Sequence, residues 1–501
     1  MVTIQMKRYQ FTFLLPFLLF LISCASLSTQ QINLSFERPK PCQEFLNRLD
    51  EVVKEAGVRD ASNVVIPGFP YLRTNRFLAA LKKNLKEDGE RDAWVRWMQE
   101  LDLKSRKKEI SNLPDETILS LMAKEAGKTD REELISRIKT CSSELLNHDQ
   151  TRPDFYTTLY SRVDVPDEYS FFRRAIGLYP LITLPVAVAT NSSRKKIRTW
   201  FNPNPDDLPI EGQLRAFVPY EKIFLHEKEI EAVIEESSGN PLGVPLLDVN
   251  MEKKLVRFFS PVFIQDVAAS YDRLGQIVWR GDRLEVDPEK PTVYYYLSHA
   301  FLKGKPILQI NYVIWYPERA GKRTPWLEFG HLDGLTARVS LDGQGKVFMV
   351  EVMMNCGCYR LFAPEKERVD RVVSKPLRFD PFMPQWLPVV SPGERLGIRV
   401  NSGWHQVERL IAVKEPPDPI PYELVPYDVL EALPHEDGRT ESVFDNRGII
   451  KGSERVERFI LFSMGIPSVG SMRQQGHHAV ELIGRVHFDD PFLFDQNFIF
   501  K

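Results

Sequence analysis

Residues 330–361 read as one β-hairpin, and their pattern predicts which residues face each other across it. The run at 342–345, Asp-Gly-Gln-Gly, is a turn signal, because glycine adopts the positive φ angles that tight hairpin loops require. Apolar and polar residues alternate on both sides of this run, as in strands with one buried face. A turn centred on the run places Val339 opposite Phe348 and makes one face of the hairpin apolar.

The open end of this hairpin gathers four residues that can carry chemistry. In the same register, His331 lies opposite Cys356, and Asp333 points to the same face. Cys358 is two residues beyond Cys356 and joins this face if the strand continues. Opposed Cβ atoms lie ~5 Å apart, and neighbours along one face lie ~7 Å apart. We therefore expect an imidazole, a carboxylate and two sulfurs to converge.

Three interpretations of this cluster stay open. In a structural one, His331 hydrogen-bonds Asp333, and the two cysteines are buried or oxidised. In the second, His331, Cys356 and Cys358 are ligands of zinc or another divalent metal, and Asp333 is either a fourth ligand or a hydrogen-bond partner of a ligand. The metal would polarise a carbonyl group or activate a bound water. In the third, Cys358 is the catalytic nucleophile, His331 takes its proton, and Asp333 is the third catalytic residue.

A short run after the hairpin carries a resemblance that bears on the third interpretation. The six residues 356–361, Cys-Gly-Cys-Tyr-Arg-Leu, resemble the S-H-G-C-x-R-hydrophobic run of L,D-transpeptidases, which cross-link bacterial cell-wall peptides through a cysteine. The resemblance implies a nucleophilic role for Cys358 and a site role for Arg360. The histidine that precedes Gly-Cys in that family is Cys356 in this chain.

A targeting signal occupies the N-terminus. Lys7 and Arg8 precede an apolar run, Phe11–Ile22, which is too short to span a bilayer comfortably. The run continues as Ser-Cys24, so that Leu-Ile-Ser-Cys resembles the lipobox of bacterial lipoproteins, whose cysteine is acylated and becomes the first mature residue. The resemblance implies lipidation of Cys24, and Ala25 implies sorting to the outer membrane. An ordinary signal peptide or a lone membrane anchor is the alternative.

These features predict a protein of the cell outer membrane that faces the periplasm and contacts the membrane through its lipid. We expect a signal peptide at 1–23 and a polar tether at 24–41. The chain has 501 residues, 43% of them hydrophobic, which is enough for two or three packed cores. A net charge of −2 predicts no nucleic-acid partner, so an envelope protein or the cell wall is the expected partner.

Residues 42–150 carry a helical pattern. Five amphipathic stretches predict a small helical bundle, which an apolar loop at 64–72 interrupts. Cys42 and Cys141 lie on two of the predicted helices. A disulfide between them suits an oxidising envelope, and two separate buried thiols are the alternative.

The remaining chain is rich in predicted strands, so the expected fold class is α+β: an N-terminal helical bundle followed by a mostly antiparallel β-domain. A mixed, proline-rich α/β segment at 151–250 connects the two parts. The β-rich domain with the candidate site spans 251–413. A proline-rich connector follows at 414–426, and residues 427–501 complete the β-domain.

Some expectations concern single segments of this second part. Two further hairpins are predicted, at 293–316 and 395–413. His299 lies on the polar face of the first, and His405 lies next to the turn of the second, where we expect it to be exposed to water. The apolar stretch 176–188 contains two prolines and is expected to be buried chain rather than a membrane span.

A second set of candidate site residues lies outside the cysteine hairpin: His299, Arg360, Arg473, His477 and His487. The leading hypothesis is metal-dependent or thiol-dependent hydrolysis or modification of an envelope substrate. The alternative is a non-catalytic envelope lipoprotein that binds a protein or ligand partner through the β-domain. The sequence carries no P-loop, dinucleotide fingerprint, nucleophile elbow or repeat of fixed period, so ATP-driven, nicotinamide-dependent and solenoid interpretations are not supported.

Overall fold

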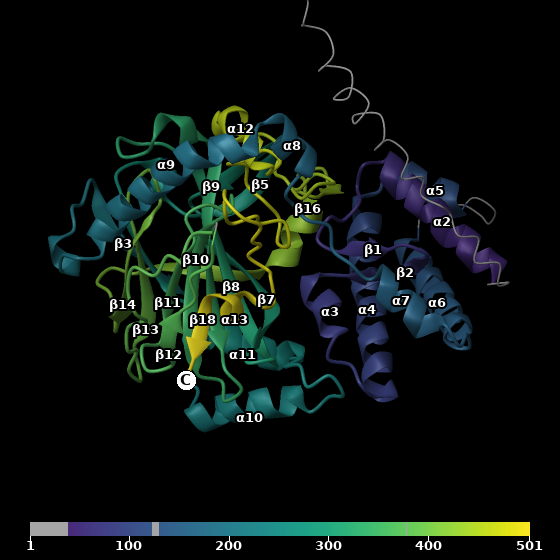
Figure 1. Ribbon diagram of the computed structural model, residues 1–501. Coiled ribbons are helices and arrows are strands. Elements are labelled where there is room, and N and C mark those ends of the chain that lie inside the picture. Colours follow the sequence, from purple (N-terminus) through teal and green to yellow (C-terminus); the bar gives the residue numbers. More distant parts are fainter. Residues whose placement is uncertain (1–38, 123–129, 377) are drawn as a thin grey trace, which may run out of the picture.

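The computed structural model describes residues 39–122, 130–376 and 378–501. The fold class is α+β, as predicted: a helical region, residues 40–200, precedes a large, mostly antiparallel, curled β-sheet. Figure 1 shows the first helices beside the sheet and two later ones lying across its upper end. The predicted signal peptide and most of the tether, with Cys24, lie outside the described residues.

The helices beside the sheet pack around an apolar core. The first, α2 (Lys40–Glu55), turns Phe45, Leu46 and Leu49 inward, because these residues recur at helical spacing. The others are α3 (Arg76–Leu81), α4 (Asp88–Asn112), α5 (Asp115–Met122), α6 (Arg131–Gln150) and α7 (Phe155–Arg162). The bundle predicted from the sequence is therefore present, and α7 extends it.

A disulfide joins α2 to α6. It pairs Cys42 with Cys141, as the sequence predicted, and the two Cα atoms lie 5.0 Å apart. The two cysteines are 99 residues apart in the sequence. A cross-link that closes so long a loop restricts the unfolded chain strongly, so it stabilises the helical region.

The apolar stretch 64–72 is a β-hairpin and not the predicted loop. Strands β1 (Val64–Ile66) and β2 (Phe69–Thr74) pair antiparallel, and β2 packs against α4. Buried Arg73 of β2 donates a hydrogen bond to Asp102 of α4 at 3.1 Å. Two short strands are marginally stable alone, so the packing on α4 explains why this stretch forms a hairpin here.

The main sheet of the described chain has ten strands in the order β11-β10-β9-β8-β7-β15-β3-β4-β13-β14. Its strands are β3 (Gln213–Pro219), β4 (Val262–Val267), β7 (Thr292–Leu302), β8 (Lys305–Arg319), β9 (Gly330–Leu341), β10 (Val347–Met354), β11 (Leu361–Pro364), β13 (Arg395–Val400), β14 (Val407–Val413) and β15 (Ile420–Pro426). The hairpins predicted at 293–316 and 395–413 are confirmed as β7–β8 and β13–β14. Part of the predicted connector is strand β15, which pairs in parallel with β7 and β3 in the middle of the sheet.

Short elements complete the β-domain. The paired strands are β5 (Gln276–Arg280) with β6 (Arg283–Asp287), β12 (Val369–Val372) with β18 (Phe498–Phe500), and β16 (Leu433–Pro434) with β17 (Thr440–Glu441). This part of the described chain also contains α10 (Glu227–Ser238), α11 (Val249–Phe259), α12 (Glu457–Ile460) and α13 (Leu493–Asn497). The C-terminal segment thus returns to the β-domain, since β18 pairs with β12.

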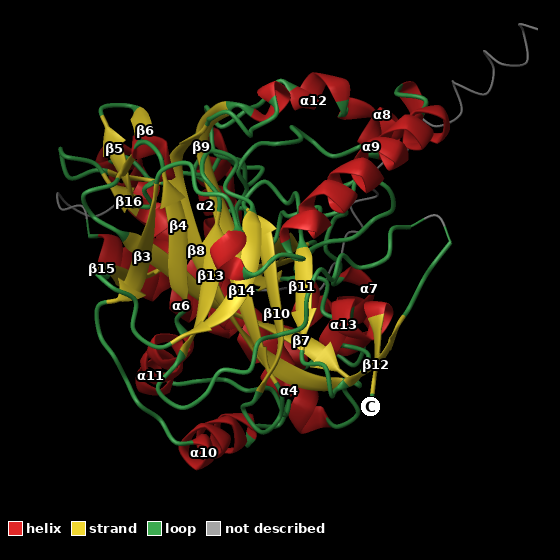
Figure 2. Ribbon diagram, turned by 90° about the vertical axis from the view of Figure 1, so that its left-hand side faces the viewer, coloured by secondary structure: helices red, strands yellow, loops and turns green. Residues whose placement is uncertain are grey.

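The apolar stretch 176–188 is not buried, contrary to the prediction. It ends α8 (Phe171–Ile176) and begins α9 (Tyr179–Trp200), and both helices lie across the upper end of the molecule in Figures 1 and 2. The helical period turns one side of α9 inward, so Val186 is buried while Val188 is exposed. Within the described residues, no helix is long and apolar enough to span a bilayer.

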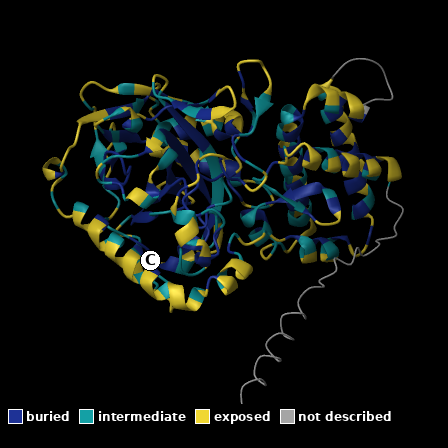
Figure 3. Ribbon diagram, turned by 90° about the horizontal axis from the view of Figure 1, so that it is seen from above, coloured by how far each residue is buried: buried dark blue, intermediate teal, exposed yellow. Residues whose placement is uncertain are grey.

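The helical region and the sheet share an aromatic interface. Phe301 of β7 stacks on Phe77 of α3 and on Phe492, with ring centroids 5.2 and 5.0 Å apart. Lys108 of α4 also forms an ion pair with buried Glu431. Figure 3 shows buried residues running through the sheet, whereas exposed residues collect on the outer sides of the helices. The two parts therefore pack closely, and the upper end of the sheet carries α8, α9, α12 and loops.

Candidate functional site

The cysteine hairpin is present as β9 and β10, but its register differs from the prediction by two residues. Val339 pairs with Val350 and not with Phe348, because the ladder shifts between Val347 and Met349. The loop is also tied by hydrogen bonds between Asp342 and the backbone that follows it. A shift of two residues preserves the face to which each side chain points, so the predicted apolar face is retained.

The cysteines lie on a tight turn after β10 and not on a continued strand. The Met354 amide donates to the Cys358 carbonyl at 3.1 Å, and the Gly357 amide donates to the Met354 carbonyl at 2.7 Å. Gly357 has φ +89°, and a Cβ there would lie 2.5 Å from the Ala479 carbonyl oxygen. The turn therefore requires glycine, and it reverses the chain into β11.

The predicted pairing of His331 with Cys356 is wrong. The β9–β10 ladder ends at Leu335 and Met354, so the two strands separate before they reach these residues. The His331 Nε2 atom lies 2.7 Å from the Leu284 carbonyl oxygen, in a half-buried position. His331 therefore binds the backbone of β6, and the structure records no contact between it and either cysteine in the described chain.

Asp333 belongs to a buried ionic cluster. Its carboxylate accepts hydrogen bonds from Arg319 Nε at 2.8 Å, His405 Nδ1 at 2.7 Å and Arg455 Nη2 at 3.4 Å. Burial alone would raise the pKa of Asp333, but these cationic neighbours hold it well below the usual range. Asp333 is thus a counter-charge for these groups, and its carboxylate is not available to take a proton from a cysteine.

His405 also belongs to this cluster, although the sequence predicted that it would be exposed to water. It is fully buried, with Nε2 3.2 Å from Asp272 and Nδ1 2.7 Å from Asp333. Burial lowers the pKa of His405, but the two carboxylates outweigh burial and raise it above the ordinary value. The sequence carried no signal for this contact, since the partners come from separate elements.

Two arginines of this cluster also change the pKa of a cysteine. Burial raises the pKa of the Cys356 thiol, but a hydrogen bond from the Cys358 side chain and the charges of Arg319 and Arg455 lower it to about 7. The Cys358 amide also lies 3.4 Å from Cys356 Sγ. The pKa of Cys358 is raised well above its usual value by that same hydrogen bond and by burial. These shifts favour the thiolate on Cys356 over the thiolate on Cys358, the residue that the sequence had favoured as nucleophile.

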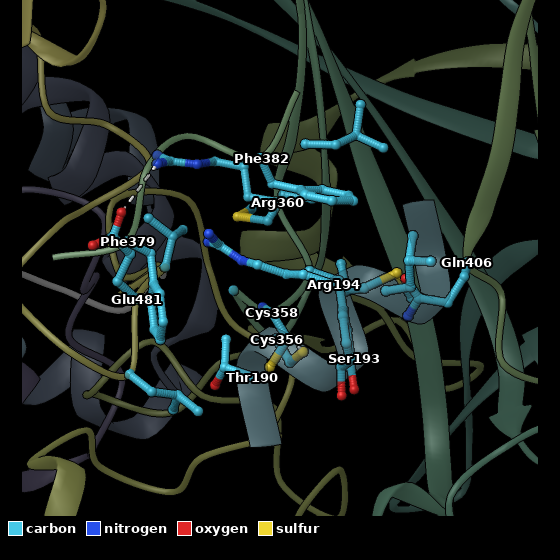
Figure 4. A pocket seen from close by; sticks show the side chains of 18 of the residues that line it. Thr190, Ser193, Arg194, Cys356, Cys358, Arg360, Phe379, Phe382, Gln406 and Glu481 are labelled. Carbon is cyan, nitrogen blue, oxygen red and sulfur yellow. Dashed lines mark hydrogen bonds and ion pairs between the residues drawn. The ribbon is translucent and has the colours of Figure 1, made fainter. Parts of the chain in front are cut away.

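Both cysteines line a cavity of about 490 Å³ under α9. Most of its lining is apolar, including Val186, Phe379 and Phe382. Figure 4 shows the two cysteines side by side, with the Arg194 side chain extending across the cavity above them. A concave, mainly apolar site with a few polar groups is the usual form of a ligand pocket.

Two arginines bring positive charge into this cavity. Arg360 lies 3.7 Å from Glu481, and its Nη1 atom has no hydrogen-bond partner within the described chain. Arg194 donates to the Asp380 carbonyl oxygen at 2.8 Å and stacks on Phe379. Arg360 was a candidate from the sequence, and the structure brings it to the cysteines.

Glu457, the first residue of α12, supplies an acid to the same cavity. Burial and the negative charge of Cys356 raise the pKa of this carboxyl group to about 8. Glu457 is therefore mostly protonated at neutral pH, next to a thiol that is half ionised. Nothing in the sequence near Glu457 distinguishes it from a surface residue, and sequence reasoning missed it.

The other candidates lie outside the cavity. His299 contacts the Pro245 carbonyl oxygen at 2.9 Å at the interface with the helical region, and burial lowers its pKa to about 4. His477 lies 2.8 Å from Glu168 Oε1, and His487 lies 3.3 Å from Asp167 Oδ1. Arg473 is buried and donates through its amide to the carbonyl before Cys356, so it supports the turn from behind.

Metal binding was the remaining sequence-based expectation. Among residues 39–122, 130–376 and 378–501, no group of three or more histidine, cysteine, aspartate or glutamate side chains is placed to hold a metal ion. The metal site therefore stays a prediction. No protein-family model matches the chain, and no curated protein or solved structure shows a significant similarity to it.

Proposed function

We propose that this chain is an outer-membrane lipoprotein, anchored at Cys24 and facing the periplasm, whose Cys356 thiolate hydrolyses or transfers acyl groups of an amphiphilic envelope substrate. The observation that carries the proposal is the position of Cys356. It lines an apolar cavity, and the positive charges of Arg319 and Arg455 lower the pKa of its thiol. A thiol held in this way is suited to nucleophilic attack, because the thiolate is the reactive form.

The cavity lining supports the substrate class. Apolar side chains such as Val186 and Phe382 suit an acyl chain, and the Arg194 and Arg360 guanidinium groups suit an anionic group at its end. The volume of about 490 Å³ is in the range of small-molecule sites. An acyl ester with a negatively charged portion would fill both kinds of surface.

The first step is acyl transfer to the enzyme. The Cys356 sulfur attacks the ester carbonyl carbon, a carbon–sulfur bond forms, and the carbon–oxygen bond to the leaving alcohol breaks. Neutral Glu457 gives its proton to the departing oxygen and becomes a carboxylate. Cys358 acts as a positioning residue, because its thiol donates a hydrogen bond to the resting Cys356 thiolate.

The second step regenerates the site. A water, or an acceptor hydroxyl, attacks the thioester carbon, and the Glu457 carboxylate takes its proton. The carbon–sulfur bond breaks, Cys356 leaves as a thiolate, and Glu457 is neutral again. The sum is hydrolysis of one ester to an acid and an alcohol, or transfer of the acyl group to the acceptor.

The test uses the chain from residue 25, which keeps every described residue, with 4-nitrophenyl esters of long and short acyl chains. We expect faster release of nitrophenol from the long-chain ester, and a thioester at Cys356 detected by mass spectrometry of acid-quenched protein. Cys356→Ser should abolish both signals, whereas Cys358→Ser should keep the adduct. Absence of turnover and adduct in the folded wild-type chain would overturn the proposal.

The same preparation tests the two rival predictions from the sequence. Tight binding of a fluorescent fatty acid without turnover would favour the non-catalytic, ligand-binding lipoprotein. A stoichiometric zinc ion that is lost in both Cys356→Ser and Cys358→Ser would favour metal chemistry, in which the ion activates a water.

A further inference from the structure

The upper end of the molecule exposes an unusual number of large apolar side chains. They include Phe171, Phe172, Leu181, Leu184, Val188 and Phe459, and the exposed fractions of Phe171 and Val188 are 76% and 72%. These residues belong to α8, α9 and α12, which all pack around the single turn Phe462–Met464. Figures 1 and 2 both show the three helices at the same end, so we call this surface the apical face.

Helix α9 has two apolar sides with different partners. Val186 and Ile197 point inward and line the cavity that holds the cysteines. Leu181, Leu184 and Val188 recur at i, i+3 and i+7, so they share the opposite, outward side. A helix of a water-soluble domain normally keeps charged residues on its outward side, and α9 does not do so in its first half. An outward apolar stripe indicates a partner.

The charges on α8 and α9 are of one sign. No aspartate or glutamate occurs from residue 169 to residue 205, whereas the same stretch contains Arg173, Arg174, Arg194, Lys195, Lys196 and Arg198. Arg173, Lys195 and Arg198 are exposed. Large apolar side chains flanked by lysine and arginine, with no acidic residue, are typical of helices that lie in the interface of an anionic membrane.

The length of the N-terminal chain is compatible with a membrane at this face. Fifteen residues separate Cys24 from Lys40, the start of α2, and an extended chain covers at most ~3.4 Å per residue, or ~50 Å in all. A body of this size has a radius of gyration of ~23 Å. A lipid on Cys24 would therefore leave the body free to turn its apical face to the same bilayer.

We infer that the apical face is a membrane-docking surface, on which α8, α9 and α12 lie in the headgroup region of an anionic phospholipid bilayer. The apolar side chains enter the acyl boundary, and the basic residues contact lipid phosphates. The docking inference rests on the apical face alone. Its consequence for the cavity, that a membrane lipid is the substrate and reaches Cys356 past α9, rests on the proposed function.

The test is flotation of the chain from residue 25, which has no lipid anchor, with vesicles of phosphatidylcholine alone or with 30% phosphatidylglycerol. We expect binding to the anionic vesicles that weakens as salt is added. Leu181→Glu with Leu184→Glu should reduce the bound fraction roughly tenfold or more, because two apolar contacts are replaced by charges that anionic lipid repels.

A matched control separates this effect from a general change of charge. Val249, the first residue of α11, is exposed to the same extent as Leu181, 66%, and α11 lies in the lower part of Figure 1, away from the apical face. Phe224, between β3 and α10, is 80% exposed and serves as the second control position. Val249→Glu with Phe224→Glu should leave flotation within about twofold of wild type. Failure of the wild-type chain to float, or equal flotation of the two double variants, would overturn the inference.

Two further readouts keep the proposals apart. Cys356→Ser should float like wild type, so docking can stand when the proposed chemistry fails. A chain that ignores vesicles but forms a dimer that Leu181→Glu with Leu184→Glu breaks, seen by sedimentation, would assign the apical face to self-association and overturn membrane docking.

Discussion

The two pairs of cysteines in this protein are built in opposite ways. Cys42 and Cys141 lie 99 residues apart in the sequence, on two helices, and form a disulfide. Cys356 and Cys358 are separated by one residue, lie on a tight turn and are free thiols. The first pair connects elements that the unfolded chain would keep apart. The second pair links no separate elements, because one turn already holds both cysteines.

The surroundings of the two pairs explain this difference. The disulfide lies in the apolar core of the helical region, where it acts as a cross-link. The free pair lies between a cavity and the guanidinium groups of Arg319 and Arg455, which favour a thiolate. The first pair therefore serves stability, and in the proposed function the second pair serves reactivity. Each of the following experiments should move one property and leave the other unchanged.

The largest effect is expected at the nucleophile. Cys356→Ser should reduce acyl-ester turnover by 10³-fold or more, because loss of a nucleophile removes the covalent route. The thermal midpoint should stay within a few degrees of wild type, since serine is of similar size. Turnover by the Cys42→Ala, Cys141→Ala double variant should remain within about threefold of wild type at 20 °C. A turnover loss in the double variant as large as that of Cys356→Ser would break the comparison.

The complementary change concerns stability. Cys42→Ala with Cys141→Ala should lower the free energy of unfolding by about 4 kcal/mol, since the disulfide closes a loop of roughly 100 residues. Urea unfolding followed by tryptophan fluorescence measures this change. Cys356→Ala is the matched control and should alter the same quantity by much less, because it removes no cross-link. Equal losses of stability would show that the disulfide has no special structural role.

The pH profile of turnover should report Cys356 and Glu457 together. Turnover needs Cys356 as a thiolate, so it should rise as pH increases through about 7. It also needs Glu457 protonated, so it should fall as pH increases through about 8. Glu457→Gln should lower turnover about 10²-fold and remove the falling limb, because no acid then ionises. A falling limb that persists in Glu457→Gln would exclude this acid.

Sequence patterns predicted the parts of this molecule that depend on local order. The helical stripe of α2, the hairpins β7–β8 and β13–β14, and the disulfide all follow from residue spacing or residue type along one segment. The β9–β10 register failed by two residues because turn geometry, and not side-chain alternation, decides it. The strand β15 was missed because its five-proline neighbourhood, 414–426, indicated a connector.

The site shows where such reasoning stops. Cys356 and Cys358 were candidates because the predicted hairpin placed them on one face, and Arg360 was a candidate because of the resemblance to L,D-transpeptidases. Arg319, Arg455, Glu457 and Arg194 come from other segments, and only the folded chain brings them to the cysteines. His331 and Asp333 were placed near the cysteines by extending a ladder that ends at Leu335. Electrostatic partners of this kind have no sequence spacing, so they are visible only in three dimensions.

The smallest effect separates the roles of the two free cysteines. Cys358→Ser weakens the hydrogen bond to the Cys356 thiolate, so the pKa of Cys356 should rise from about 7 toward the ordinary value. The rate of alkylation of Cys356 by iodoacetamide at pH 7 should fall roughly tenfold, while the rate at pH 10 stays nearly unchanged, because the thiolate fraction changes only at the lower pH. Peptide mass spectrometry can follow Cys356 specifically. An equal loss of rate at both pH values would mean that Cys358 shapes access to the cavity and does not set the charge on Cys356.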